Sequence, residues 1–174
     1  MEAARRGGEA AFLRLFEEHY LPLFRFAYRL TGSVADAEDV VQECFLELLR
    51  PGCGYDPRRT PIRTYLFGAV RNQSLKRRAK PYPAADGLEI GEDRTPESRI
   101  LQAELADAVA EAVRQLPETQ REILILAHYE QMPLAEIARV MDLSVAAVKS
   151  RLERARARLK EELAHYAPVR ERKP

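Results

Sequence analysis

The chain has 174 residues, of which 46% are hydrophobic and 32% charged, the composition of an ordinary globular protein with one domain or two small ones. No apolar run approaches the roughly 20 residues of a membrane-spanning helix, and no apolar leader segment opens the chain. We therefore expect a cytoplasmic protein without membrane insertion. The net charge is only +1, yet acidic and basic residues are segregated into separate stretches.

The N-terminal part of the sequence has the apolar spacing of helices, without the alternation typical of strands. This spacing predicts a first helix over residues 9–30. A second helix begins at Ser33 or Ala35 and continues to about Arg50, with acids near its start, where they complement the helix dipole. Residues 31–49 contain five acids and no base, so this second helix is acidic.

A loop rich in Pro and Gly leads into a third predicted helix, from Pro61 to about Lys80. Proline suits the first helical position because its missing N–H needs no partner there. The first half of this helix is apolar and the second half is basic. Residues 58–80 together contain eight bases and no acid. Such a single-sign block is often only a solvated face.

The two cysteines, Cys44 and Cys53, lie nine positions apart, and the three histidines are scattered. Zinc sites draw on closely spaced ligand pairs, and the sequence contains none. Cys44 continues the apolar helical stripe of Val40, Val41 and Leu48, which favours a buried structural thiol. We therefore predict neither a metal site nor a cofactor.

Residues 81–98 form a polar stretch rich in Pro and Gly without apolar periodicity, which predicts a flexible linker and a domain boundary. We therefore divide the chain into one domain over residues 1–80 and a second over residues 99–174. Beyond the linker, the apolar positions predict two helices that meet near Pro117.

Residues 133–159 have the pattern of a helix-turn-helix, whose second helix enters the major groove of DNA. The first helix ends near Asp142, and Ser144 is a good N-cap for the second because its hydroxyl accepts from backbone N–H groups. We expect five apolar positions of the second helix to face the core: Val145, Val148, Leu152, Ala155 and Leu159. Residues 144–160 carry six bases against one acid. Two basic stretches separated by an acidic segment suggest a polyanion held at two points.

The outward face of the second helix supplies the candidate DNA contacts. Ala146 and Ala147 lie at its N-terminal end, where small side chains allow close approach to base edges. The side chains that can bond to base edges are Lys149, Ser150 and Glu153, and those suited to phosphates are Arg154, Arg156 and Arg158. The alternative is a surface helix whose charges only form salt bridges.

Two parts of the sequence resemble conserved regions of the sigma-70 family of transcription initiation factors. "DAEDVVQECFLELLR" (36–50) and "YDPRRTPIRTYLFGAVRNQSLKRRAK" (55–80) look like the second region, and "LPETQREILILAHYEQMPLAEIARVMDLSVAAVKSRLERARARL" (116–159) resembles the fourth. The third region is absent between them, as in the extracytoplasmic-function (ECF) group. The resemblance implies an all-α fold of two small helical domains, a region 2 bundle and a region 4 domain with the helix-turn-helix, joined by a flexible linker.

The resemblance implies an ECF-type sigma factor, which binds core RNA polymerase, recognises the −35 and −10 promoter elements and helps to melt the −10 region. The acidic helix resembles the surface that docks on a coiled coil of the polymerase β′ subunit, and a contact with the β flap is also expected. The matching positions on the acidic helix are Asp36, Asp39, Gln42, Glu43 and Phe45. Asp36 and Asp39 could instead only favour the helix N-terminus, an effect of about 0.3–1 kcal/mol each.

By the same resemblance, the loop and the third helix bind the −10 element and its melted strand. This task needs cations for the backbone and stacking surfaces for unpaired bases. The positions suited to it are Tyr55, Arg58, Arg59, Arg63, Arg71, Asn72, Lys76, Arg77 and Arg78. Tyr65 could add a stacking surface or pack in the core, and Asn72 could hold a captured base or make a local turn bond. Family membership also implies an anti-sigma factor as a partner, and no small-molecule substrate.

Two other classes of protein compete with this interpretation. A conventional helix-turn-helix regulator would bind DNA without polymerase, and it would leave the basic residues 58–80 unexplained. An enzyme would need a catalytic constellation, but the sequence has no phosphate-cradling Gly loop, nucleophile elbow or cluster of metal ligands. We therefore do not expect an enzyme.

Overall fold

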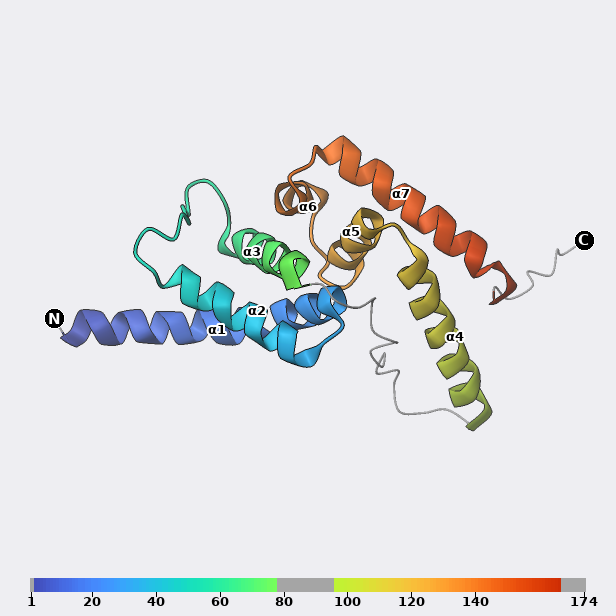
Figure 1. The fold of residues 1–174 in the computed structure, drawn as a ribbon, viewed down its shortest axis with the longest axis horizontal. Helices are drawn as coiled ribbons and strands as arrows, with labels where there is room; N and C mark the ends of the chain where they lie inside the picture. The colour runs from blue at the N-terminus through green and yellow to red at the C-terminus, as the bar shows by residue number, and fades with distance from the viewer. Residues whose placement is uncertain (1, 78–95, 167–174) are drawn as a thin grey trace, which may run out of the picture.

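The computed structural model describes residues 2–77 and 96–166, which contain helices and no strand (Figure 1). The helices are α1 (Glu2–Thr31), α2 (Val34–Leu48), α3 (Ile62–Arg77), α4 (Pro96–Gln115), α5 (Glu118–His128), α6 (Leu134–Met141) and α7 (Val145–Glu162), followed by the short 3-10 helix η1 (Ala164–Tyr166). The prediction of an all-α fold is confirmed. None of these described helices combines the length and apolarity that crossing a bilayer requires. The predicted linker over residues 81–98 lies outside the described residues, except for its end, residues 96–98, which belongs to α4.

The N-terminal lobe consists of α1, α2 and α3, which pack against one another on the left of Figure 1. Its core side chains have no exposed surface, and they include Leu23, Phe26, Val40, Leu66 and Phe67. The ring centroids of Phe26 in α1 and Phe67 in α3 are 5.3 Å apart. The apolar half of α3 is therefore anchored in the core, and this anchor sets which of its polar side chains point outward.

The turn from α1 to α2 leads into a second helix that begins at Val34, between the two expected starting residues, Ser33 and Ala35. Gly32 adopts a φ of 71°, in the left-handed region that glycine occupies without strain. Ser33 follows in extended backbone, and its hydroxyl accepts from the Asp36 N–H at 3.3 Å, which makes it the N-cap of α2. Because only residues 32 and 33 separate the two helices, the acidic α2 returns directly alongside α1.

The C-terminal lobe is built around α5, which packs against α6 and α7. Every residue of α5 from 121 to 126 is buried. A helix enclosed to this degree has to satisfy its polar side chains with protein partners. Arg121 does so in part by donating to the carbonyl of Arg114 at 2.8 Å.

α6 and α7 form the predicted helix-turn-helix. Asp142 ends α6 in the left-handed region, with a φ of 53°, and its N–H bonds to carbonyls of the last turn. Ser144 then caps α7, because its hydroxyl accepts from the Ala147 N–H at 3.2 Å. The predicted cap is therefore confirmed.

The buried face of α7 differs from the prediction at one position. Val148, Leu152 and Ala155 are buried, and Leu159 is partly buried, as expected. Val145 is 47% exposed, so its expected place in the core is wrong. Val145 is the first residue of α7, and its neighbours Ser144 and Ala146 are exposed as well.

The two lobes meet at a seam in which α3 packs against α6 and α1 reaches α5 (Figure 1). Across the seam, the Arg71 Nε lies 2.8 Å from the Oε2 of Glu122, a carboxylate of α5 with no exposed surface. Nearby, the Thr64 hydroxyl donates to the Glu136 Oε2 at 3.2 Å. Polar side chains of α3 therefore donate hydrogen bonds to carboxylates of the C-terminal lobe.

Two further arginines of the N-terminal lobe reach the loop after α5. Arg63 donates to the backbone carbonyl of Glu130, and the guanidinium of Arg29 lies 4.1 Å from the ring centroid of Tyr129. Burial raises the pKa of the Glu130 carboxyl, and the nearby guanidinium groups of Arg29 and Arg63 act against this rise. The seam thus contains several arginines that face one acidic loop.

We predict that Arg71→Ala opens the seam. The substitution removes the guanidinium that lies 2.8 Å from the Oε2 of the Glu122 carboxylate, which has no exposed surface, so the closed seam loses stability. Separation of the lobes relieves this loss by giving the carboxylate access to water. Small-angle X-ray scattering should therefore give a larger radius of gyration for Arg71→Ala than for the unchanged chain.

The matched control is Arg59→Ala, because Arg59 is an exposed arginine in the loop before α3. This control should leave the scattering curve unchanged. Equal curves for Arg71→Ala and the unchanged chain would mean that the ion pair does not hold the lobes together.

Candidate functional site

The outward face of α7 presents the predicted DNA contacts. Its exposed side chains are Ala146, Lys149, Glu153, Arg154, Arg156 and Arg158, and the partly buried ones are Ala147 and Ser150. The Lys149 Nζ and the Glu153 Oε1 are 4.0 Å apart, in an exposed pair one helical turn apart. Such a pair contributes at most a few tenths of a kcal/mol, so both side chains can exchange it for contacts to bases.

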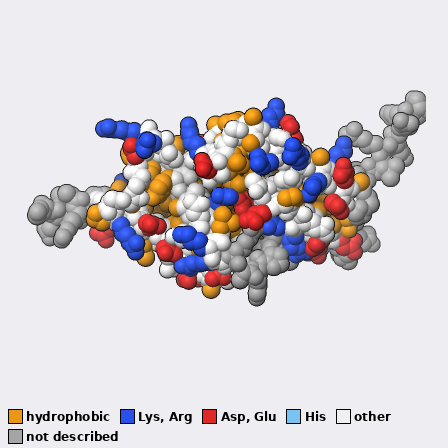
Figure 2. All heavy atoms as spheres, turned by 45° about the horizontal axis from the view of Figure 1, so that its top comes forward, with side chains coloured by type: hydrophobic (Ala, Val, Ile, Leu, Met, Phe, Trp, Pro, Cys, Tyr) orange, Lys and Arg blue, Asp and Glu red, His pale blue; other side chains and the backbone are white. Residues whose placement is uncertain are grey.

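Cationic side chains are distributed over both lobes. On the face shown in Figure 2, Lys and Arg side chains project along the length of the molecule, with acidic side chains between them. A polyanion that follows this face would meet positive charge on each lobe.

The acidic face of α2 presents most of the predicted polymerase contacts. Asp39 and Gln42 are exposed, Glu43 is half-buried, and the exposed fraction of the Asp39 side chain is 68%. Asp36 is half-buried in the first turn, where its backbone N–H bonds to the capping Ser33. The side chains best placed for a partner are therefore Asp39, Gln42 and Glu43.

Phe45, the remaining predicted polymerase contact, is 2% exposed. Its ring centroid lies 6.0 Å from that of Phe12 and 4.9 Å from that of Phe16. The ring therefore packs α2 onto α1 and does not face a partner. Phe45 belongs to the apolar stripe of α2, with Val41 and Cys44, and this stripe faces the core.

The predicted −10 contact Arg77 lies against the acidic face of α2. Its guanidinium bonds to the Asp39 Oδ2 at 3.2 Å and to the Glu43 Oε2 at 2.7 Å. The helix expected to bind DNA is therefore linked by ion pairs to the helix expected to bind polymerase. Arg78 lies outside the described residues.

The loop before α3 is fixed by Tyr65. The Tyr65 hydroxyl donates to the Cys53 carbonyl at 2.8 Å, and its ring centroid lies 5.1 Å from that of Tyr55. Both rings are half-buried, so Tyr65 holds the loop on α3. The loop in turn presents Arg58 and Arg59, which are exposed.

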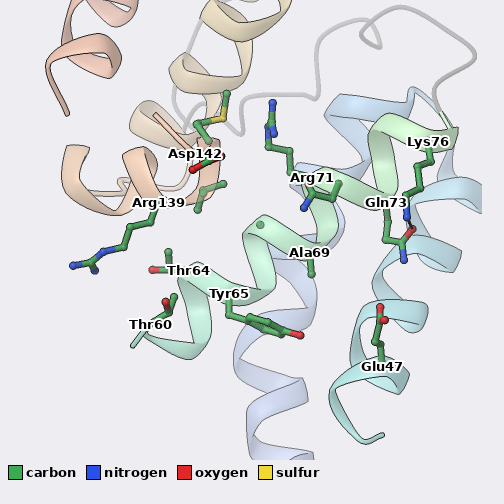
Figure 3. Close-up of a pocket in the computed structure, with 14 residues that line it drawn as sticks. Glu47, Thr60, Thr64, Tyr65, Ala69, Arg71, Gln73, Lys76, Arg139 and Asp142 are labelled. Carbon is green, nitrogen blue, oxygen red and sulfur yellow. Dashed lines mark hydrogen bonds between the residues drawn. The ribbon is translucent and has the colours of Figure 1, made fainter. Parts of the chain in front are cut away.

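An open groove of about 850 Å³ runs between α3 and α6 (Figure 3). On the α3 side, Asn72, Gln73 and Lys76 line it, and on the α6 side Arg139 and Asp142 do. The Lys76 Nζ lies 3.4 Å from the Gln73 Oε1, as the dashed line in Figure 3 marks. The groove combines the cations Lys76 and Arg139 with the ring of Tyr65, and proteins bind unpaired nucleotide strands with cations and aromatic surfaces.

Two predicted −10 contacts bond to the C-terminal lobe, and one of them, Arg71, also lines the groove. Arg63 and Arg71 point across the seam to Glu130 and Glu122. The other predicted −10 positions that the structure describes differ in exposure. Arg58, Arg59, Asn72 and Lys76 are exposed, whereas Tyr55 and Arg77 are half-buried.

Glu122 is a residue that the sequence did not single out. It follows Arg121 inside a helix that is otherwise apolar at its centre, and this charge in an apolar stripe was the available signal. Its partner Arg71 comes from the other domain, and helical periodicity carries no information about that pairing.

The cysteine prediction holds for Cys44, which is buried. Burial, with the nearby carboxylates of Glu47 and Glu43, raises the pKa of the Cys44 thiol to about 12. The thiol is therefore neutral and unreactive at physiological pH. In the parts of the chain that the structure describes, no three His, Cys, Asp or Glu side chains gather as a metal site would need.

Both halves of the chain match known protein families. Residues 15–80 match the family model of Sigma-70 region 2, and residues 106–159 match that of Sigma-70, region 4. The chain is 35% identical over 156 residues to the ECF RNA polymerase sigma factor SigM of Mycobacterium tuberculosis. The matched stretch covers 88% of this chain and 77% of SigM. It is 24% identical over 177 residues to the ECF RNA polymerase sigma factor SigW of Bacillus subtilis, with 94% of both chains covered.

Solved structures share the arrangement of helices. The structure of CnrH in complex with the cytosolic domain of CnrY matches with a TM-score of 0.68 at 27% identity, over 95% of this chain and 96% of the matched chain. The sigma factor RpoE of Bartonella quintana, in complex with the anti-sigma factor NepR, matches with a TM-score of 0.67 at 21% identity, over 88% of this chain and 97% of the matched chain. The second likeness concerns the fold alone. The two region matches and the identity with SigM show that this chain belongs to the ECF RNA polymerase sigma factors of the sigma-70 family.

Proposed function

We propose that this ECF sigma factor docks on core RNA polymerase through α2, reads the −35 element with α7 and holds the melted −10 strand along α3. The observation that carries the proposal is the presence of an exposed acidic helix face and an exposed basic helix face in one chain. The protein positions promoter DNA and catalyses no covalent step, and it acts in the cytoplasm, where polymerase meets DNA.

The tasks divide along the chain. Residues 1–80 dock on polymerase and bind the −10 element. Residues 99–174 bind the −35 element, and residues 81–98 connect the two domains. This division follows the family matches, which cover residues 15–80 and 106–159.

The −35 element is read by the first turns of α7. Ala146 and Ala147 allow the helix to approach base edges, and Lys149 and Glu153 follow on the same exposed side. Ser144 fixes the helix start by its capping bond, so the register of these side chains in the major groove is set by the turn. The arginines of the later turns suit phosphates and position the helix without reading sequence.

The −10 strand is held by the α3 side of the groove. Asn72, Gln73 and Lys76 line it, and Arg58 and Arg59 are exposed on the loop before α3. Arg71 also lines the groove, although its Nε bonds to Glu122. Contact of DNA with Arg63 requires the lobes to part, because its guanidinium bonds to the Glu130 carbonyl of the C-terminal lobe. We propose that polymerase holds the lobes apart at the spacing of the two promoter elements.

An anti-sigma factor is the proposed antagonist of this chain. The similar RpoE of Bartonella quintana was solved in complex with the anti-sigma factor NepR, and CnrH with the cytosolic domain of CnrY. A partner that held the seam closed would keep Arg63 on the Glu130 carbonyl and away from DNA.

Loss of the charges on α2 should weaken polymerase binding. We predict that Asp39→Asn combined with Glu43→Gln lowers the affinity for core polymerase about tenfold, since two charge pairs of about 0.7 kcal/mol each amount to that factor. Titration of the fluorescently labelled full chain with core polymerase measures this affinity.

The matched control for the α2 variant is Glu104→Gln combined with Asp107→Asn, which removes the same charge from exposed positions of α4. Equal losses in the two variants would contradict a specific docking surface. A chain that bound promoter DNA equally well with and without core polymerase would instead be a conventional helix-turn-helix regulator.

Two substitutions on α7 should have different effects on promoter binding. Arg154→Ala should weaken holoenzyme binding to all −35 sequences and reduce the slope of log K against log salt by about 0.9, because one phosphate contact is lost. Lys149→Ala should instead change the preferred base at one −35 position, with a discrimination loss of about 1–3 kcal/mol. Binding to a promoter library randomised at the −35 element checks both, and a change of base preference in Arg154→Ala alone would reverse the assignment.

A further inference from the structure

Arg77 lies where the two proposed surfaces of the N-terminal lobe meet. It belongs to the last turn of α3, the basic helix, but its guanidinium contacts the acidic helix. The Nη1 bonds to the Asp39 Oδ2 and the Nη2 to the Glu43 Oε2, at 3.2 and 2.7 Å. One cation therefore occupies both of the carboxylates that are proposed to receive polymerase.

The carboxylates need a cation at this position. Asp39 and Glu43 are four residues apart on α2, so they lie one above the other on the same helix face and repel each other. The guanidinium of Arg77 relieves this repulsion by bonding to one oxygen of each. Cations of a partner would relieve it equally well, and two sets of cations on the same carboxylates would repel each other.

The ion pairs are weak enough to exchange. The Arg77 side chain is 33% exposed, and the side chains of Asp39 and Glu43 are 68% and 45% exposed. Ion pairs open to water to this extent contribute little, because solvent and salt screen the attraction. A partner that covers the acidic face and excludes water can therefore displace Arg77.

Once displaced, Arg77 has a second destination close by. Gln73 lies one helical turn before Arg77 on α3, and Lys76 immediately precedes it, and both line the groove between α3 and α6. Rotation of the long arginine side chain moves the guanidinium from α2 towards this groove. A phosphate of a strand bound there would provide a bidentate partner.

We propose that Arg77 exchanges partners when polymerase binds: the free protein holds it on Asp39 and Glu43, and the bound protein releases it to a phosphate of the −10 strand. The proposal rests on the proposed docking role of α2. Polymerase binding then strengthens DNA binding, and DNA binding strengthens polymerase binding by the same factor, as linkage requires. The exchange gives a physical reason for a factor that binds DNA firmly only on polymerase.

The exchange predicts opposite effects of one substitution on the two partners. Arg77→Ala should bind core polymerase about two- to fivefold more tightly, because the partner no longer displaces an ion pair. The holoenzyme should bind a promoter with a single-stranded −10 region with a slope of log K against log salt smaller by about 0.7. Titration of the labelled full chain with core polymerase and salt-dependent binding of that promoter by the holoenzyme measure the two quantities.

Lys76→Ala is the matched comparison, since it removes the neighbouring cation of α3, whose Nζ contacts Gln73. It should reduce the salt slope in the same way without tightening polymerase binding. Arg77→Gln keeps the aliphatic part of the side chain and should reproduce both effects of Arg77→Ala, which guards against a folding defect in the alanine variant.

Three results would overturn the exchange. Weaker core binding by the Arg77 variants would mean that Arg77 positions the carboxylates for polymerase, and unchanged core binding would mean that it does not compete. Tighter core binding with an unchanged salt slope would exclude transfer to DNA. Failure of the docking proposal is distinguishable, because Asp39→Asn with Glu43→Gln would then bind core polymerase as tightly as the unchanged chain.

Discussion

Glu122 is a carboxylate with no exposed surface, and the guanidinium that contacts its Oε2 comes from the other lobe. A charge enclosed in this way is stable only with a close counter-charge, so the position of α5 and the position of α3 depend on each other. The Thr64–Glu136 and Arg63–Glu130 contacts follow from that alignment. The Arg71–Glu122 ion pair is therefore a central contact of the seam between the lobes, and opening the seam requires another environment for both charges.

α3 has three polar faces that compete for its cations. One face, with Arg63 and Arg71, is matched to the C-terminal lobe, and a second, through Arg77, is matched to the acidic face of α2. The third lines the groove with Asn72 and Lys76. The apolar half of the helix is fixed by Phe67, so a cation can leave one face for another only by side-chain rotation or by separation of the lobes. In this arrangement, several of the arginines that we propose as DNA contacts are paired with carboxylates of the same chain.

Local sequence signals predicted the helices and their caps because those depend on neighbouring residues. Ser144 acts as the predicted N-cap, since an N-cap is decided within one turn. Pairings between the lobes, such as Arg71 with Glu122, depend on how two separate helices pack. The apolar periodicity of each helix does not predict that packing. Phe45 and Val145 show that the sequence pattern predicts the burial of single residues less well. The ring of Phe45 is in the core, although its motif suggested a contact with polymerase. Val145, the first residue of α7, is exposed, as are its neighbours Ser144 and Ala146.

The most direct test of the account is transcription in vitro with core polymerase on a promoter library randomised at both elements. With the full chain present, the account predicts transcripts that start at a fixed distance from a shared pair of sequences, and none of them without it. Absence of such transcripts, together with binding of the isolated chain to the same DNA, would contradict the claim that α2 and α7 serve one promoter through polymerase.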